Sequence, residues 1–517
     1  MRKITLFIIS LLTLTLSLQA AESPLLNTIA RELDQVGGQR GFVWDLTNGN
    51  ELPPGWIIPT TDRIPGSLLA DSIRNLIAGA QQTVDITTMA PTPDGAFNKA
   101  IVDGVKAVAA AKRQVTVRLL IGNTNPLGPV KTHDVAKELL EVVKGTPVTV
   151  FVGAVTSCLP PAKCAGANGL IVASTNHSKI VAVDGKEAIV GGHNLWATDY
   201  LDPKPIYDLS MRVRGPAAFT AANFAARLWD FTCTNNRHSV PAWLTYVSSV
   251  MPYDKKPDVQ GVCSFYPRMD APAGTGTVPI LTVARSGAGI QGLPPAFSPS
   301  YQWSDLAMRR VLESAQSTIR ISQQDLMTTT RALNLPAIDA VAKLIARPNP
   351  GEVYIMMTNQ FATSPGAIPT PYSFLVSPMA VGGEIKKVVA KQMGLPADDP
   401  SVRQRVCTHL HLGSIARYGE DGKPTNFWSP IRRMGNHSKM YMVDDHVFYI
   451  GSHNMYPITV LSSQPRDWNF LHGSLQELGY IVDDEKAAKE LIEKYWNPIW
   501  EPTRALSVSG DGNCRIE

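Results

Sequence analysis

Apolar residues form strand-like runs and helix-like stretches that alternate in the same order in two parts of the chain. In the first half, residues 80–87 have the pattern of a helix end followed by a strand, 96–111 that of a helix, and 115–120 that of a second strand. A strand–helix–strand order predicts a sheet flanked by helices. The second half repeats this order at 315–322, 337–346 and 353–357.

A β-hairpin is predicted late in each half. Residues 177–183 are strand-like, Asp184 and Gly185 form a strong two-residue turn signal, and 188–190 return as a strand. In the second half the turn pair is Asp444 and Asp445, a weaker signal, before the strand-like run 447–450.

Both predicted hairpins carry the same polar sequence. Asn-His-Ser-Lys occurs at 176–179 and 436–439, and each copy later reaches Gly, a small residue, His and Asn, at 191–194 and 451–454. Every paired position differs by 260 residues. One active site assembled from both halves is therefore expected.

Side chains two apart on a strand share a face, so the His and Lys of each copy should project together. These pairs are His177 with Lys179 and His437 with Lys439. Each lysine is followed, after four more residues, by an aspartate, Asp184 or Asp444. These two aspartates end the repeated motif, and they should face away from the His and Lys side chains and support the site through hydrogen bonds. His193 and His453 also repeat; packing or supporting roles are expected for them, with a direct role as the alternative.

A length of 517 residues favours two lobes over one core. We predict an α/β fold of two homologous lobes, each a mixed β-sheet flanked by α-helices, related by a pseudo-two-fold axis with the active site between them. Residues 22–265 should form the first lobe and 266–517 the second. The Pro- and Gly-rich stretch from about 253 to 300 should link them, although its strand-like run at 278–283 blurs the boundary.

Residues 1–21 have the features of a secretory signal peptide. Arg2 and Lys3 precede a mostly apolar run at 4–18, and small residues follow, so cleavage is expected near Ala20. The apolar run is short for a membrane span, and an uncleaved anchor is the alternative. We expect a secreted protein, extracellular or periplasmic.

Composition and charge indicate a globular protein that does not bind nucleic acid. With 44% hydrophobic and 18% charged residues, the chain resembles globular proteins. The formal net charge of +4 falls to about +2 without the two basic residues of the leader. A nucleic-acid partner is not expected, because such proteins usually carry a basic stripe.

The six cysteines are compatible with disulfides in an exported protein. Cys158 with Cys164 and Cys233 with Cys263 are candidate pairs, but the connectivity is not deducible from sequence. No two cysteines have CxxC spacing, which argues against a metal site. A disulfide is also expected for Cys514, in preference to lipidation.

The repeated side chains suit the cleavage of a phosphodiester, whose negative charge repels nucleophiles and whose leaving alkoxide is strongly basic. Two lysines and two asparagines supply fixed donors for the phosphate oxygens. A neutral imidazole can attack phosphorus, and an imidazolium can protonate the leaving oxygen. An ordinary histidine pKa of about 6.5 makes both states accessible.

The doubled pattern of His-x-Lys, four residues and Asp resembles the phospholipase D superfamily, in particular its secreted bacterial members of the streptomycete type. The likeness includes residues 88–93, 95–97, 176–194, 321–326 and 449–457. It implies a phosphohistidine intermediate, with His177 as the nucleophile and His437 as the general acid and then base. It also implies phosphate binding by Lys179, Lys439, Asn194 and Asn454, and no metal or other cofactor.

Asp208 and Glu477 resemble family carboxylates that orient the histidines, although the close relatives have Asp where this chain has Glu477. Trp196 and Tyr200 resemble aromatics near the family's head-group pocket, where a ring face could hold a quaternary ammonium with about 0.5–2 kcal/mol. Ordinary packing is the alternative for both. Cys407 resembles a family cysteine whose partner has no counterpart around 328–331.

The expected function is that of a monomeric, secreted phospholipase D acting at a membrane or micelle surface. It should hydrolyse the distal phosphodiester of glycerophospholipids, such as phosphatidylcholine, to phosphatidic acid and a free alcohol. Interception of the covalent intermediate by other alcohols predicts a transphosphatidylation side activity. The alternatives are a secreted phosphodiesterase acting on nucleic acid, a synthase that joins lipid head groups, and a catalytically inactive lipid-binding toxin module.

Overall fold

The structure is a computed structural model, and it describes most of the chain. The described residues are 23–36, 39–122, 132–158, 173–235, 242–247, 270–286, 303–328, 333–365, 371–455, 475–510 and 513–516. The predicted leader lies outside these ranges. Among the helices described, none combines the length and apolar character needed to cross a bilayer.

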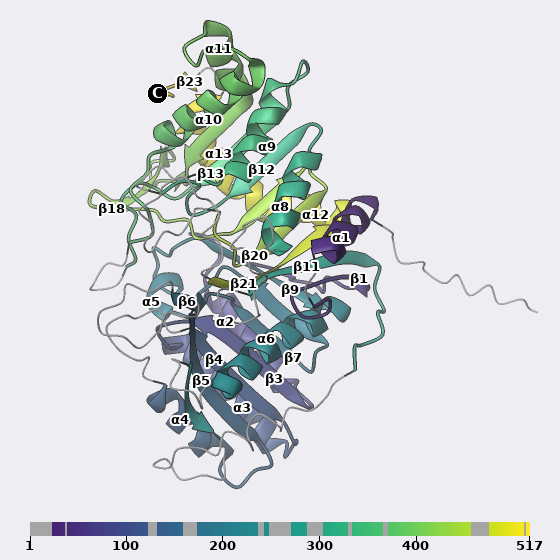
Figure 1. The fold of residues 1–517 in the computed structure, drawn as a ribbon. Helices are drawn as coiled ribbons and strands as arrows, with labels where there is room; N and C mark the ends of the chain where they lie inside the picture. The colour runs from purple at the N-terminus through teal and green to yellow at the C-terminus, as the bar shows by residue number, and fades with distance from the viewer. Residues whose placement is uncertain are drawn as a thin grey trace, which may run out of the picture.

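The first lobe, in the lower part of Figure 1, is built on a mixed sheet. Its strands lie in the order β2 (Ile57–Thr60), β9 (Asp208–Arg214), β8 (Glu187–Gly191), β7 (Ile180–Val183), β3 (Thr83–Met89), β4 (Thr116–Gly122), β5 (Thr149–Cys158) and β10 (Ala242–Val247). Strands β3, β4 and β5 are parallel to one another, and the other neighbours are antiparallel.

Helices cover both faces of this sheet. Leu119 and Leu120 are neighbours on β4 and point to opposite faces, so they enter different apolar cores. The core containing Leu119 includes side chains of α2 (Ser67–Ala78), α3 (Gly95–Ala110) and α4 (His133–Val143). The core containing Leu120 includes side chains of α6 (Pro216–Asn235).

The second lobe repeats this strand order. Its strands are β11 (Val278–Ser286), β21 (Leu475–Asp483), β20 (Val447–Gly451), β19 (Met440–Val443), β12 (Thr318–Ser322), β13 (Glu352–Met357), β14 (Leu410–Ser414), β22 (Ser509–Gly510) and β23 (Asn513–Cys514). Its main helices are α8 (Trp303–Ser314), α9 (Leu335–Ala346), α10 (Pro378–Met393), α11 (Pro400–His409), α12 (Glu485–Leu491) and α13 (Asn497–Ala505). The predicted α/β class, with mixed sheets flanked by helices, is confirmed.

The lobes are joined by backbone pairing as well as by the chain. Strand β6 (Ala173–Asn176) pairs with β5 of the first lobe and, in parallel, with β21 of the second. Strand β1 (Trp44–Asn50) pairs with β11, and α1 (Pro24–Val36) packs against α8. Figure 1 shows this N-terminal helix beside the second lobe. The strand-like run expected within the linker is β11, which belongs to the second sheet.

The two hairpins form as predicted, but their first strands begin later than expected. Strands β7 and β19 start at Ile180 and Met440, so each His and Lys precedes the strand. The reason is that residues before the strand pair across the lobe boundary, where the N–H of His177 donates to the carbonyl of Gln476 at 2.9 Å. Asp184 has φ +53° and Gly185 +58°, and Asp444 and Asp445 have +52° and +51°. Positive φ at both central residues is the requirement of a type I′ hairpin turn.

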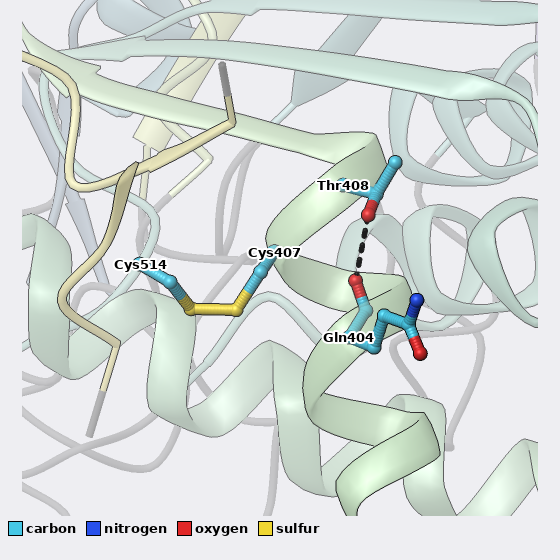
Figure 2. The surroundings of a disulfide bond; sticks show 4 residues. All are labelled: Gln404, Cys407, Thr408 and Cys514. Carbon is cyan, nitrogen blue, oxygen red and sulfur yellow. Dashed lines mark hydrogen bonds between the residues drawn. A yellow bond between two sulfur atoms is a disulfide. The ribbon is translucent and has the colours of Figure 1, made fainter. Parts of the chain in front are cut away.

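A disulfide ties the C-terminus to the second lobe. Cys407 of α11 bonds to Cys514 of β23 across a sequence separation of 107 residues (Figure 2). The expectation of a disulfide at Cys514 is confirmed, and the missing partner of Cys407 is supplied by the end of the chain. Cys233 is also disulfide-bonded. The side chains of Cys158, Cys164 and Cys263 lie outside the described part, so the pairs proposed for them stay predictions.

Replacing Cys514 by Ser should lower the free energy of unfolding by about 2–4 kcal/mol, because the bond closes a long loop in the unfolded chain. Denaturant titration measures this loss. Cys407→Ser should cause a similar loss, and the double variant should lose no more than either single variant. Additive losses would contradict a single shared bond.

Candidate active site

Each repeated histidine is placed by a strand from the other lobe. Gln476 at the start of β21 accepts the backbone N–H of His177, and Tyr207, just before β9, accepts that of His437 at 2.7 Å. The residue that follows each acceptor is a carboxylate, Glu477 in one case and Asp208 in the other. The two contacts are therefore equivalent and reciprocal.

The carboxylates reach the histidine side chains across the same boundary. Nδ1 of His177 lies 2.9 Å from Oε2 of Glu477, and Nδ1 of His437 lies 2.8 Å from Oδ2 of Asp208. The two imidazole centres are 6.5 Å apart, with their planes at 71°. The expectation that the histidines of both halves meet in one site is confirmed.

These contacts determine which ring nitrogen of each histidine holds the proton. An ionised carboxylate only accepts hydrogen bonds, so Nδ1 of each ring must be the donor. In the neutral imidazole Nε2 is then unprotonated and available as a base or nucleophile. A carboxylate at Nδ1 also stabilises the imidazolium form.

Burial controls the protonation of the basic groups. It lowers the pKa of His177 to about 4, an effect that Glu477 partly offsets and Lys179 increases. Burial and the two lysines also lower the pKa of His437 well below its usual value. Burial lowers the pKa of Lys179 well below its usual value and that of Lys439 to about 7, although the nearby carboxylates oppose this. An anion among these groups would favour their protonated forms.

The lysines lie beside the histidines. Nζ of Lys179 donates to the carbonyl of His177 at 2.6 Å, and Nζ of Lys439 donates to that of His437. An ammonium has three donors, so each lysine keeps others for a ligand. Both side chains are buried.

The asparagines carry polar atoms that need partners. Asn454 is 1% exposed, and in the described part of the chain neither its Nδ2 nor its Oδ1 has a hydrogen-bond partner. Oδ1 of Asn194 is likewise unpaired among the described residues, while its backbone N–H donates to the hydroxyl of Tyr200 at 3.3 Å. Unpaired buried amides are uncommon in proteins, and a bound phosphate oxygen would satisfy the Asn454 donor.

The last residues of the two motifs lie away from the histidines, at the hairpin turns. The Asp184 carboxylate accepts the backbone N–H groups of residues 81–83 at 2.7–2.9 Å. Asp444 accepts those of 316–318 at 2.7–3.1 Å. Burial alone would raise the pKa of Asp444, but these N–H groups lower it. Both carboxylates fasten the hairpin to the start of the neighbouring strand, which is the supporting role expected from their position.

The residues that follow each hairpin fit the two carboxylates differently. A Cβ added at Gly192 would lie 2.1 Å from Oδ1 of Asp208, so a glycine is needed there. Ser452 occupies the equivalent place, and its hydroxyl donates to Oε2 of Glu477 at 2.5 Å. Burial alone would raise the pKa of Glu477, but His177 and other basic groups lower it to about 2.

The two predicted head-group aromatics have different surroundings. Tyr200 is 1% exposed, its ring lies against His193 and Phe97, and its hydroxyl donates to Asp208 at 2.8 Å. That hydroxyl is also 3.4 Å from Nδ1 of His437. Trp196 is half-buried, and its indole N–H donates to the carbonyl of Pro91 at 3.1 Å. The Tyr200 contacts support the histidine–carboxylate pair.

The repeated His193 and His453 are buried and hydrogen-bonded. Nε2 of His193 lies 2.9 Å from the Thr60 hydroxyl and Nδ1 lies 2.8 Å from that of Ser210. Nδ1 of His453 is hydrogen-bonded to the hydroxyl of Tyr449. Burial lowers the pKa values of these histidines to about 4 and about 3.

Sequence analysis missed Tyr372 and Asp199. The Tyr372 ring meets His437 edge-on at 5.2 Å between centres, and its hydroxyl donates to Asp199 of the first lobe. Burial raises the pKa of Asp199 to about 6. Neither residue belongs to a repeat, so the duplication gave no signal for them.

In the ranges the structure describes, no three His, Cys, Asp or Glu side chains gather in a way that could hold a metal ion.

Comparison with known proteins identifies the family. The family described as "Cardiolipin synthase, PLD-like domain" matches residues 73–202. A phospholipase D of Streptomyces antibioticus is 31% identical over 545 aligned positions, which cover 95% of this chain and 89% of the relative. The chain belongs to the phospholipase D superfamily. It is similar to the streptomycete type, and it is a phosphodiesterase of the phospholipase D kind.

The fold also has a solved counterpart. The structure of phosphatidylserine synthase from Haemophilus influenzae Rd KW20 matches with a TM-score of 0.51. The match covers 95% of this chain and 94% of the other, at 12% identity. At this identity the comparison supports a shared fold alone.

Asp444→Gly should destabilise the protein by about 1–3 kcal/mol more than Asp445→Gly. Glycine accepts the positive φ of both positions, so the difference between the two losses of stability reports the contributions of the two aspartate side chains. Asp444 loses its backbone hydrogen bonds, whereas Asp445 loses an ion pair with Arg320 that is partly exposed. Denaturant unfolding of both variants makes the comparison, and equal losses would contradict the supporting role of Asp444.

Sulfate should bind the site more tightly as the pH falls from about 9 to about 6. An anion favours the protonated forms of Lys439 and the histidines, so binding takes up protons, and raising the pH removes them. Calorimetric titration with sulfate measures the affinity, because the charge of sulfate is constant in this range. Lys439→Arg should flatten the dependence above about pH 7, since arginine stays charged. A wild-type affinity that does not change with pH would contradict this prediction.

Proposed function

We propose that the protein is a secreted phospholipase D that hydrolyses the distal phosphodiester of glycerophospholipids, with phosphatidylcholine as a substrate, to phosphatidic acid and a free alcohol. The observation that carries the proposal is the pair of buried histidines, one from each lobe, 6.5 Å apart and each bonded to a carboxylate of the other lobe. A phosphate between two such rings would face a nucleophile on one side and an acid on the other.

In the first step, Nε2 of His177 attacks phosphorus and displaces the head-group alcohol. The leaving oxygen takes the Nε2 proton of His437, whose imidazolium is stabilised by Asp208 and by the anionic substrate. The lysines and asparagines bind the non-bridging oxygens, where charge gathers in the transition state. The product of this step is a phosphatidyl group on His177 and a neutral His437.

In the second step, His437 removes a proton from water, and the hydroxide oxygen attacks phosphorus. The phosphorus–nitrogen bond breaks, phosphatidic acid leaves, and both histidines regain their starting states. Another alcohol in place of water would give a new phosphodiester, which accounts for a transphosphatidylation side activity.

His177→Ala should lower turnover of phosphatidylcholine in mixed micelles by about a thousandfold or more, because it removes the nucleophile. His437→Ala should also be slow, and a phosphatidyl adduct on the protein should be detectable by intact mass spectrometry. His446→Ala is the matched control, because this histidine follows the second motif but is half-exposed and pairs with Asp483 at 2.8 Å. Choline release and plasmid cleavage should both be measured in chelator.

Three outcomes would contradict the proposal. They are near-wild-type turnover by His177→Ala, faster cleavage of plasmid than of phosphatidylcholine, and lipid binding without choline release. The second would favour a nuclease, and the third an inactive lipid-binding module.

A further inference from the structure

Three large apolar side chains are exposed beside the segments that hold His437. Phe361 is 55% exposed, Leu375 50% and Ile431 97%. Single exposed apolar residues are ordinary, but these three lie on two segments that both approach the same histidine.

Phe361 and Leu375 also have unusual backbone conformations. Their φ angles are +70° and +62°, in a region that bulky side chains avoid. Among the residues that the structure describes, the other non-glycine positions with positive φ are Lys112, Asp184, Asp444 and Asp445, all polar. Asparagine or glycine would suit positions 361 and 375 better for folding, so stability does not explain the large apolar side chains there.

These two residues flank the segment that carries Tyr372. The Gln360 side-chain amide donates to the carbonyl of Leu375 at 2.8 Å, and the backbone N–H of Tyr372 donates to the carbonyl of Ala362 at the same distance. The Tyr372 ring is 5.2 Å from the ring of His437. Phe361 and Leu375 therefore lie at the edge of the candidate active site.

Ile431 lies at the tip of a small hairpin formed by β17 (Phe427–Ser429) and β18 (Arg432–Arg433), a few residues before His437. The Arg433 guanidinium is 5.9 Å from the ring centre of Phe361 and 4.6 Å from that of Phe427. No carboxylate among the described residues forms an ion pair with Arg433. The hairpin thus places an apolar tip and an available cation next to Phe361.

We propose that Phe361, Leu375 and Ile431 enter the surface of a phospholipid bilayer or micelle while Arg433 contacts the lipid phosphates. We call these four residues the interfacial patch. Apolar side chains are stable at the boundary between head groups and acyl chains, and an arginine on an apolar stem extends its charge into the phosphate layer. This inference rests on the proposed function, because the patch would bring a lipid phosphodiester to His177 and His437.

A lipid surface fits the patch better than a second copy of the chain. A protein seated on these residues would cover the approach to His437, whereas a membrane would present substrate at that approach. Arg433, which has no carboxylate partner in the described part of the chain, matches the phosphate groups that every phospholipid surface carries.

The test uses the triple variant Phe361→Asn, Leu375→Asn and Ile431→Asn in the mature protein. Asparagine tolerates positive φ, so folding should be preserved. Affinity for phosphatidylcholine vesicles, measured by sedimentation, should fall by about tenfold or more, and the initial rate on vesicles should fall with it. The rate on a short-chain phosphatidylcholine below its critical micelle concentration should change by less than about twofold, since no interface is present.

Leu395→Asn is the matched control, because Leu395 is 36% exposed and lies past the far end of α10. That helix has 16 residues and is about 24 Å long, and Leu375 precedes its start whereas Leu395 follows its end. Vesicle binding by this variant should equal that of the wild type.

Unchanged vesicle binding by the triple variant would overturn the inference. So would a wild-type dimer that becomes monomeric in the triple variant while vesicle binding is kept, because the patch would then join two copies. If the wild-type protein fails to hydrolyse the monomeric lipid, the proposed function fails instead. Sedimentation with vesicles still decides the role of the patch in that case.

Discussion

Each lobe supplies the carboxylate that holds the other lobe's histidine, and the site depends on this exchange. Glu477 holds His177 and Asp208 holds His437, and in both cases the neighbouring backbone carbonyl also accepts the histidine's N–H. N–H···O hydrogen bonds need distances of about 2.7–3.2 Å, so a small separation of the lobes would release both imidazoles. Strand pairing between β6 and β21 fixes the same boundary. Rigidity between the lobes is therefore a requirement of the chemistry.

The geometry is suited to an anion. Two lysines and two histidines are buried together, and burial lowers the pKa of each of them. Asn454 lies in the same site with amide atoms that have no partner among the described residues. A phosphate would favour the protonated forms of these four groups and would accept a hydrogen bond from the Asn454 amide. Substrate binding and the protonation that the chemistry needs are thus coupled.

Much of this arrangement could be predicted from the sequence, because a repeat is visible without a structure. The common offset of 260 residues identified the paired motifs, and turn chemistry located both hairpins. The resemblance indicated Asp208 and Glu477 as carboxylates that orient the histidines, and both contacts form. The exchange between the lobes could not be predicted, since it depends on how two sheets meet. Tyr372 and Asp199 were missed for the same reason. The Cys407–Cys514 bond needed the three-dimensional path of the chain's last residues.

The two carboxylate sites are related but no longer identical. Asp208 approaches Gly192 and receives the hydroxyl of Tyr200, whereas Glu477 receives that of Ser452. The same crossed contacts would form if two separate copies of one lobe associated about a symmetry axis, but both imidazoles would then have identical neighbours. Fusion into a single polypeptide removes that restriction. Each half can accumulate its own substitutions, so two rings of common origin can specialise for opposite tasks.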